Sequence, residues 1–391
     1  MINKDFFKRG VIEVIDEKSF WEHLKSEKKQ RIKYGVDPTR PDIHLGHAVA
    51  MWRLRELQDN GHTIIFLIGD YTTKIGDPSG RNSTRPVLTD LEIEKNAKTY
   101  FEQAGKILDL DKTEIRYNSE WFKKLDFNDV LRLTGKFTVA QIIERDDFEK
   151  RLKEGTDVGL HEVLYPVMQA YDSVILNADV EFGGSDQRFN LLAGRDLQKK
   201  MDQRPQDLVI MKLLVGTDGK VKMSKSADNY IGITDAPDQM FGKVMSIPDS
   251  VIVEYFELAT KVSDQEIEEI KEELNSGKNP RDIKIKLAKE IVKLYHDEKA
   301  AKSAAAEFKN VFSKKELPAE IPEVEIEYGN YNILTLLSLI GAVTSNSEAR
   351  RLVGQGGVKI DEARITDPKA EMGVAKDMVI QVGKQKYYKV K

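Results

Sequence analysis

Apolar positions follow two alternating periods in the first part of the chain. Residues 31–36 (RIKYGV) have the composition of a short strand, and residues 46–59 carry apolar side chains at roughly helical spacing, which predicts a helix. The pair Asn60-Gly61 is a typical helix end. The continuous apolar run at 63–68 (TIIFLI) then predicts a strand buried on both faces of a parallel sheet. Strand, helix and strand together predict a βαβ unit.

The same alternation continues to about residue 228. Strand-like runs recur at 175–176, 180–182 and 208–210, and segments of helical period lie at 90–107 and 158–172. The pattern predicts an α/β, Rossmann-like doubly wound domain over 1–228 with a parallel sheet and a connective insert at about 111–160.

The pattern becomes purely helical after residue 229. Ser263 and Glu266 form a capping-box pattern before a periodic apolar stripe, and Gly277 and Pro280 separate that helix from the next. We therefore expect a helical domain over 229–316. Residues 317–330 contain two prolines and few apolar side chains, so we interpret them as a linker. Residues 331–391 then form a small α+β module of short helices followed by strands.

Composition narrows the class of protein. The 391 residues are 40% hydrophobic and 32% charged and include no cysteine, which excludes disulfides and thiolate metal sites. No run of 18 apolar residues occurs and the N-terminus lacks a signal-peptide core, so we expect a cytoplasmic protein that does not enter a membrane. The tail from 331 to 391 holds 10 Lys and Arg against 6 Asp and Glu, whereas the other 330 residues hold 51 against 59. A basic end on an acidic body fits a small RNA-binding module or a plain solubility pattern.

Two short motifs carry the candidate chemistry. The first is HLGH at 44–47, shortly after Asp37-Pro38-Thr39, and the second is KMSKS at 222–226. The two histidines of HLGH could be a metal pair, buried core residues or phosphate-binding groups. No third ligand of the right type lies nearby in sequence, which disfavours a metal site.

Attack of a carboxylate on the α-phosphate of ATP would suit these residue types. Such a transition state is crowded and anionic, so catalysis depends mostly on positioning and charge stabilisation. Gly46 lets the backbone approach a nucleotide closely. His44 and His47 lie at a helix start and can donate hydrogen bonds to phosphate oxygens. Lys222 and Lys225 can close over a leaving pyrophosphate.

These motifs resemble those of a known family. HLGH and KMSKS resemble the signature motifs of class I aminoacyl-tRNA synthetases, and IGDPSGR (75–81), YPVMQAYD (165–172) and GGSDQ (183–187) resemble stretches of bacterial tyrosyl-tRNA synthetases. The resemblance implies activation of tyrosine with ATP and Mg²⁺, without a protein-held metal, and transfer of the tyrosyl group to the 3′ end of tRNA(Tyr). It also implies a homodimer formed through the insert.

The resemblance assigns roles to individual residues. The groups implied to act in catalysis are His44, His47, Thr39, Lys222 and Lys225. The groups implied to bind ATP are Gly46, Asp186, which would hold the ribose, Met223, Ser224 and Lys225. The groups implied to bind tyrosine are Asp37, Asp77, Tyr165, Gln169, Asp172, which would accept the phenolic hydroxyl, and Gln187. The spacing 165, 169, 172 places three of these on one helix face.

One position departs from the family pattern. Many members place a tyrosine two residues before the glycine of the first strand, where it also contacts the phenol, but this chain has Lys33 there and Tyr34 one residue later. Adjacent strand residues face opposite ways, so Tyr34 is not an automatic substitute and the second phenol contact stays open.

The alternatives to a tyrosyl-tRNA synthetase are a tryptophanyl-tRNA synthetase, which Asp172 disfavours, a nucleotidyltransferase that never binds RNA, and a non-catalytic RNA-binding protein.

The tail resembles the RNA-binding fold named after ribosomal protein S-four. We expect a helix at Ser345–Val353 with Arg350 and Arg351 exposed, a turn at Gly354–Gly357 and a strand at Val358–Ile360. Arginines beside a glycine-rich turn suit a phosphate backbone, so these two arginines are candidate tRNA contacts. A small dimerisation or capping module is the alternative.

Overall fold

A computed structural model describes residues 7–78, 88–313, 321–343, 345–383 and 386–391. The chain divides into two compact units, Met1–Glu298 and Lys299–Lys391, and each is described here by itself. The quoted stretch IGDPSGR extends to Arg81, and its last three residues lie outside the described residues.

The first unit is built on a six-stranded sheet in the order β1-β6-β5-β2-β3-β4. Strands β2 to β6 are parallel to their neighbours, and β1 pairs antiparallel with β6 at one edge. The strand bounds are β1 Val11–Ile15, β2 Arg31–Val36, β3 Thr63–Ile68, β4 Thr113–Tyr117, β5 Val180–Gly184 and β6 Asp207–Met211. The predicted parallel α/β domain is confirmed.

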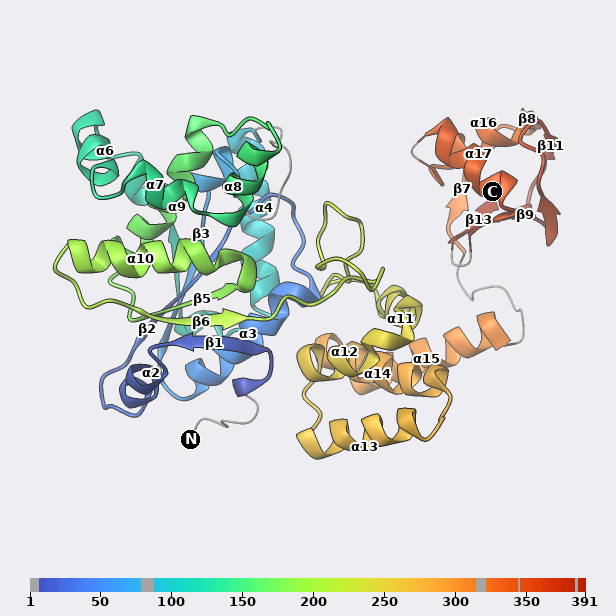
Figure 1. Cartoon of the computed structure of the whole chain (residues 1–391). Helices are drawn as coiled ribbons and strands as arrows, with labels where there is room; N and C mark the ends of the chain where they lie inside the picture. Colours follow the sequence, from blue (N-terminus) through green and yellow to red (C-terminus); the bar gives the residue numbers. More distant parts are fainter. Residues whose placement is uncertain (1–6, 79–87, 314–320, 344, 384–385) are drawn as a thin grey trace. The chain divides into compact units, whose positions relative to one another are not determined.

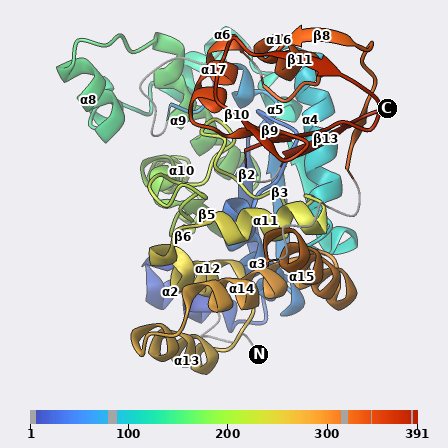
Figure 2. The same ribbon diagram turned by 90° about the vertical axis from the view of Figure 1, so that its right-hand side faces the viewer.

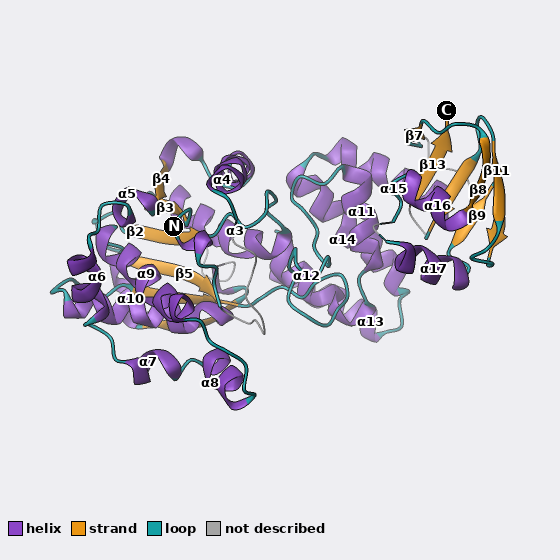
Figure 3. Ribbon diagram, turned by 90° about the horizontal axis from the view of Figure 1, so that it is seen from above, coloured by secondary structure: helices purple, strands orange, loops and turns teal. Residues whose placement is uncertain are grey.

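Helices cover both faces of this sheet. Helices α9 (Leu160–Ile175) and α10 (Arg188–Lys200) lie on one face, and α3 (Leu45–Asp59) and α4 (Asp90–Ala104) lie on the other (Figures 1 and 3). The remaining α-helix before the insert is α2 (Glu17–Leu24). Strand β3 is almost fully buried, as expected for a strand covered on both sides.

The strand order reverses at β2. From this central strand the chain moves to β3 and β4 on one side and later to β5 and β6 on the other. In such sheets a crevice opens at the carboxyl ends of the strands where the order reverses, because the flanking connections leave in opposite directions. The predicted site residues Asp37 and Asp186 follow β2 and β5, so the topology brings them to this crevice.

Two sequence predictions within this unit are wrong. Residues 175–176 are not a strand: Ile175 ends α9 and Leu176 caps it, and both pack in a cluster with Ile65. An apolar pair is too short to reveal its period, so it could not be distinguished from a buried helix end. The predicted insert also begins too early, because β4 pairs with β3 in the main sheet. The helices of the insert follow β4, namely α5 Ser119–Phe122, α6 Phe127–Thr134, α7 Val139–Ile143 and α8 Asp146–Lys153, and α5 packs on β3 through Trp121 and Phe122.

The segment that follows residue 229 and ends at Ser313 is helical, as predicted for 229–316, of which 314–316 lie outside the described residues. The helices are α11 Pro237–Ser246, α12 Ile252–Ala259, α13 Asp264–Asn275, α14 Pro280–Tyr295 and α15 Glu298–Ser313 (Figure 2). Ser263 caps α13 by accepting a hydrogen bond from the Glu266 amide. The boundary between the two compact units falls at the start of α15.

The second unit contains short helices and strands around its own core. Helices α16 (Ile333–Leu339) and α17 (Asn346–Gly354) pack against the strands (Figure 3). The strands form one sheet in the order β10-β9-β12-β13-β7 and one pair, β11-β8. Their bounds are β7 Glu323–Val324, β8 Gly329–Asn332, β9 Val358–Ile360, β10 Ala363–Ile365, β11 Glu371–Val374, β12 Val379–Val382 and β13 Lys386–Val390.

The predicted linker at 317–330 is partly wrong. Residues 323–324 form β7, which pairs with β13, and Gly329 begins β8, which pairs with β11. Edge strands this short bury few side chains, so their composition resembles that of a linker. Residues 317–320 lie outside the described residues.

Candidate active site

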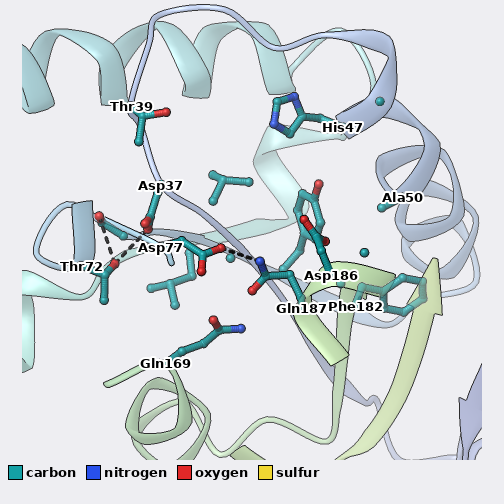
Figure 4. Close-up of a pocket in the computed structure, with 18 of the residues that line it drawn as sticks. Asp37, Thr39, His47, Ala50, Thr72, Asp77, Gln169, Phe182, Asp186 and Gln187 are labelled. Carbon is teal, nitrogen blue, oxygen red and sulfur yellow. Dashed lines mark hydrogen bonds between the residues drawn. The ribbon is translucent and has the colours of Figure 1, made fainter. Parts of the chain in front are cut away.

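One cavity of about 610 Å³ opens at the carboxyl ends of the central strands. It contains every predicted catalytic, ATP-binding and tyrosine-binding residue: Asp37, Thr39, His44, Gly46, His47, Asp77, Tyr165, Gln169, Asp172, Asp186, Gln187, Lys222, Met223, Ser224 and Lys225. Figure 4 shows Thr39 and His47 in one region of this cavity and Gln169 in another, with Asp77 and Gln187 between them.

A chain of hydrogen bonds fixes the acidic groups that follow β2. The Tyr165 hydroxyl on α9 donates to Asp37 Oδ2 at 2.9 Å, and the Thr72 hydroxyl donates to Asp37 Oδ1 at 2.9 Å (Figure 4 shows the Thr72 bond). Gly69, at the end of β3, makes room for this contact: an added Cβ would collide with Asp37 and Thr72. Burial, followed by the charge of Asp37, raises the pKa of Tyr165 well above its ordinary value, so Tyr165 is a neutral donor.

Asp77 belongs to a second hydrogen-bonded group. Gln187 Nε2 donates to Asp77 Oδ2 at 2.5 Å, and Arg145, almost completely buried, lies with Nη2 3.6 Å from Asp77 Oδ1. Arg145 also donates to Asn190, which in turn donates to Gln187. Asp77 thus faces the cavity as a positioned carboxylate able to accept hydrogen bonds from an ammonium group.

Asp172 lies at the bottom of the cavity. It is 3% exposed and accepts hydrogen bonds from the indole of Trp121 at 2.9 Å and from Asn118 Nδ2 at 3.4 Å. Burial raises the pKa of Asp172 to about 7, while the charge of Lys33 and these two hydrogen bonds lower it. A carboxylate with this environment can accept a further hydrogen bond from a substrate hydroxyl.

Lys33 and Tyr34 point to opposite faces of β2, as the alternation of strand side chains requires. Lys33 is fully buried and forms an ion pair with Glu181 on the neighbouring strand β5, with Nζ 2.8 Å from Oε1. The ring of Tyr34 instead lies 6.1 Å from that of Phe66, and burial and the charge of Asp186 raise its pKa. Tyr34 therefore does not reach the side of the sheet that carries Asp172.

The rings of the two histidines lie close together at the start of α3, tilted by 35° to each other. Their ring centroids are 3.8 Å apart, and His47 Nδ1 accepts a hydrogen bond from the His44 amide. Burial lowers the pKa of His47 to about 3 and lowers that of His44 well below its ordinary value, so both rings are neutral near pH 7. Neutral imidazoles donate one hydrogen bond each. A Cβ at Gly46 would lie 3.0 Å from the His44 ring, so the glycine leaves this space open.

The two lysines of KMSKS differ in position. Lys222 Nζ forms an ion pair with Asp186 Oδ2 at 2.5 Å. Lys225 is 8% exposed and donates to the Tyr100 hydroxyl at 2.7 Å and to the Arg40 carbonyl at 3.0 Å. Its Nζ also lies 4.6 Å from the centroid of the Tyr100 ring. Lys225 thus lines the cavity but is docked on α4.

Several groups of the site were not predicted. Asn118, Trp121 and Arg145 lie in the segment that follows β4, where no motif marks them. The sequence could have indicated Lys33 and Glu181, because each is a charged residue inside an otherwise apolar strand. Charged residues on neighbouring buried strands need partners.

Arg350 and Arg351 lie on the exposed surface of α17, as predicted. With Asn346 and Ser347 they line a hollow of about 350 Å³. No group of three or more His, Asp or Glu side chains that could hold a metal ion occurs among the described residues, and no described helix is long and apolar enough to cross a membrane.

Comparison with known proteins gives the family. A family described as "tRNA synthetases class I (W and Y)" matches residues 25–313, and one described as "Tyrosine--tRNA ligase SYY-like C-terminal domain" matches residues 313–390. Fold, cavity and these matches define a class I aminoacyl-tRNA synthetase.

Curated relatives narrow the class. A tyrosine–tRNA ligase of Thermotoga maritima is 52% identical over 384 residues, 98% of this chain and 96% of the relative. A tyrosine–tRNA ligase of Bordetella avium is 51% identical over 387 residues, 98% of this chain and 94% of the relative. The chain belongs to the tyrosine–tRNA ligase family of bacteria.

Solved structures agree in fold. A C-terminally truncated mitochondrial tyrosyl-tRNA synthetase of Aspergillus nidulans matches with a TM-score of 0.64 and 24% identity, covering 78% of this chain and 94% of that one. A tyrosyl-tRNA synthetase of Archaeoglobus fulgidus complexed with L-tyrosine matches with a TM-score of 0.60 and 24% identity, covering 77% and 97%.

Proposed function

We propose that this tyrosine–tRNA ligase activates L-tyrosine in the 610 Å³ cavity, with ATP supplied as its Mg²⁺ complex, and then transfers the tyrosyl group to the 3′ end of tRNA(Tyr). The observation that carries the proposal is the pairing of a buried carboxylate, Asp172, with the HLGH and KMSKS groups in one cavity. The match to the C-terminal domain of tyrosine–tRNA ligases and the tyrosine–tRNA ligase relatives favour tyrosine over the tryptophan alternative.

The amino acid occupies the end of the cavity that lies between α9 and the sheet. The phenolic hydroxyl donates to Asp172, and the α-ammonium group is bound by Asp77 with Tyr165 and Gln169 nearby. Asp37 lies close to this ammonium group, and Gln187 binds near the substrate carboxylate. The hydrogen bonds among these side chains support the assignment, because each acceptor is already oriented before substrate arrives.

The nucleotide occupies the HLGH and KMSKS end. Gly46 allows the purine to lie close to the start of α3, Asp186 binds the ribose hydroxyls, and Met223 and Ser224 contribute the loop that contacts the adenosine. The tyrosine carboxylate attacks the α-phosphorus and pyrophosphate leaves with its bonding electron pair. Asp186 is paired with Lys222 in the structure, so ribose binding requires Lys222 to move towards the phosphates.

Neutral histidines and cationic lysines divide the work on the phosphates. His44, His47 and Thr39 donate hydrogen bonds without adding charge, which lets them position ATP without binding pyrophosphate too tightly. Lys222 and Lys225 supply the positive charge that stabilises the transition state. Lys225 must leave Tyr100 to reach the leaving pyrophosphate.

The parts outside the catalytic domain bind tRNA. We assign 229–316 to the anticodon arm and 331–391 to the tRNA backbone through Arg350 and Arg351, whose exposure and shared hollow on α17 support this role. The transfer of tyrosine to tRNA supplies protein synthesis, and we place the enzyme in the cytoplasm for that reason.

The insert forms a homodimer interface. It carries five large apolar side chains that are exposed: Phe127 at 75%, Leu131 at 54%, Val139 at 70%, Leu152 at 49% and Leu160 at 79%. Several exposed apolar groups within one short segment favour a protein–protein interface. A second copy of this chain is the partner that the family resemblance favours.

ATP–pyrophosphate exchange with tyrosine and with tryptophan tests the activation step, and charging of a tRNA(Tyr) transcript tests the transfer. We expect exchange with tyrosine alone, followed by charging. Exchange with tryptophan at a comparable rate would overturn the assignment of the amino acid. Exchange without charging would overturn the proposed transfer step and the roles of Arg350 and Arg351.

A further inference from the structure

A buried ion pair lies directly under the amino-acid end of the cavity. Lys33 on β2 and Glu181 on β5 occupy paired positions of two parallel strands, are 0% and 1% exposed, and approach to 2.8 Å. Removing two charges from water costs several kcal/mol per ion, and replacing such a pair with apolar groups is often neutral or stabilising. Stability alone therefore does not explain why this pair is here.

Lys33 binds helix α9 on both sides of Asp172. Its ammonium group donates to the Gln169 carbonyl at 3.1 Å and to the Ser173 hydroxyl at 2.8 Å. Ser173 in turn donates to Glu181 Oε2 at 3.0 Å. The pair thus ties the segment of α9 that carries Asp172 to the centre of the sheet, and it places both of its charges next to that carboxylate.

The groups that face Asp172 are few. Trp121 and Asn118 reach it from the side of α5, Lys33 from β2, Glu181 from β5, and Tyr165 from its own helix. Lys33 and Glu181 act in opposite directions on the pKa of Asp172: Lys33 lowers it and so favours the ionised form, and Glu181 raises it. Of the two, Lys33 acts more strongly.

We propose that Lys33 is a specificity-determining positioning residue, which holds Asp172 ionised and in register so that it accepts the substrate phenol, with Glu181 keeping Lys33 in place. This inference rests on the proposed role of Asp172 in binding the phenol. All three contacts of Lys33 are with protein groups, so it acts through Asp172 and does not replace the hydroxyl contact that the sequence left open. The positive charge of Lys33 favours the ionised form of Asp172, which accepts the phenol, whereas a second hydrogen-bonding side chain would bind the phenol directly.

The charge of Asp172 affects which substrate the cavity selects. Phenylalanine lacks the hydroxyl and gains nothing from an ionised acceptor, whereas tyrosine does. Weakening the ionised state of Asp172 therefore reduces tyrosine activation and leaves phenylalanine activation nearly unchanged. A purely structural role of the pair would reduce both.

Two variants give shifts of opposite sign. Glu181→Gln preserves the hydrogen-bonding shape but removes the negative charge, so the acid limb of kcat/KM for tyrosine should move to lower pH. The double variant Lys33→Met with Glu181→Gln removes both charges, and because Lys33 has the larger effect, the limb should move to higher pH by roughly one unit. In the double variant the tyrosine-to-phenylalanine ratio of kcat/KM at pH 7 should fall about fivefold, because a one-unit rise from a pKa of about 7 leaves about a tenth of Asp172 ionised instead of about half.

A matched control joins α9 to α8. Arg151 on α8 and Glu162 near the start of α9 form another buried ion pair, with side chains 2% and 6% exposed and a distance of 2.8 Å. Arg151→Met with Glu162→Gln removes a pair of the same kind without placing charge at Asp172. It should change both substrates equally and leave the acid limb in place.

The measurement is ATP–pyrophosphate exchange on the full chain from pH 5.5 to 9 with each amino acid, with thermal unfolding to establish that each variant is folded. The role of Lys33 would be overturned if the acid limb of kcat/KM for tyrosine did not move in opposite directions in the two variants. It would also be overturned if the tyrosine-to-phenylalanine ratio fell equally in the Arg151→Met with Glu162→Gln control. If the double variant does not fold, the downward shift in Glu181→Gln still decides. Asp172→Asn tests the underlying assumption: an unchanged ratio there would remove the proposed phenol contact itself.

Discussion

Lys225 offers a direct test of how the KMSKS loop works. Its ammonium group is docked on Tyr100 and the Arg40 carbonyl, away from bulk water. If the lysine acts on pyrophosphate only in the transition state, Lys225→Ala should lower the rate of adenylate formation and leave tyrosine affinity almost unchanged. We expect a loss of at least about 100-fold, the scale of removing one charge-stabilising donor.

The structure sets what this loss requires. A net effect of 100-fold corresponds to about 2.7 kcal/mol. Leaving Tyr100 costs a hydrogen bond from a charged donor and a cation–π contact, together about 2 kcal/mol for this buried lysine. The lysine must therefore gain about 5 kcal/mol from pyrophosphate in the transition state, which is within reach of charge-assisted hydrogen bonds in a site that excludes water.

Tyr100→Phe separates the docked position from the acting one. It keeps the ring but removes the hydroxyl that accepts from Lys225, so release becomes easier by about 1 kcal/mol and adenylate formation should stay normal or rise by up to about fivefold. Lys220→Ala, an exposed lysine of the same loop, is the control and should have no effect. Single-turnover formation of tyrosyl-adenylate measures all three. A normal rate in Lys225→Ala refutes the catalytic role, and a parallel loss in Tyr100→Phe shows that the lysine acts from its docked position.

Three further predictions use other parts of the molecule. Burial raises the pKa of Asp172 from its ordinary 3.8 to about 7, so the folded state holds an extra proton between these values and stability falls as pH rises through that window. Asp172→Asn should therefore increase the free energy of unfolding more at pH 8 than at pH 4, by up to about 4 kcal/mol, and the melting temperatures at both pH values check this. Replacing Arg350 and Arg351 with alanine should leave pyrophosphate exchange intact, weaken tRNA binding and reduce its logarithmic salt dependence by about 2, and a filter-binding salt titration would contradict the assignment if the slope did not change. Phe127→Glu should convert the proposed dimer to monomer, which sedimentation equilibrium would report, and an unchanged mass would remove the insert face as the interface.

The fold was predictable wherever a run was long enough to show its period. The β2–α3–β3 unit appears within a residue of its predicted bounds, because a six-residue apolar run and a fifteen-residue amphipathic stretch each have one interpretation. Short segments failed for the opposite reason. The two-residue strand β7 and the end of α9 are decided by tertiary pairing, and β4 is an edge strand whose residues are all half-buried, so its pattern carries little signal.

The site residues were predictable as a set because their motifs stand at strand ends and helix starts, and the sheet topology brings those places together. Their partners were not. Trp121 reaches Asp172 across 51 positions and Lys225 meets Tyr100 across 125, and no local pattern encodes such separations. Only charged residues inside buried strands, such as Lys33, indicate by themselves that a partner exists.

Selection of tyrosine over phenylalanine brings these observations together. An apolar pocket gains little by rejecting a substrate that lacks one hydroxyl, so discrimination must come from polar groups left unpaired when phenylalanine enters. Asp172 fulfils this condition because its two protein donors, Trp121 and Asn118, are too few for the lone pairs of an ionised carboxylate. In the proposed function, the missing donor is the phenol of the substrate. The buried carboxylate costs stability when the substrate is absent, because burial raises the pKa of Asp172 to about 7, whereas the charge of Lys33 lowers this pKa and so favours the ionised form. The buried carboxylate of Asp172 therefore accounts both for the proposed discrimination against phenylalanine and for the loss of stability. A variant such as Asp172→Asn, which relieves the loss of stability, should also reduce the discrimination.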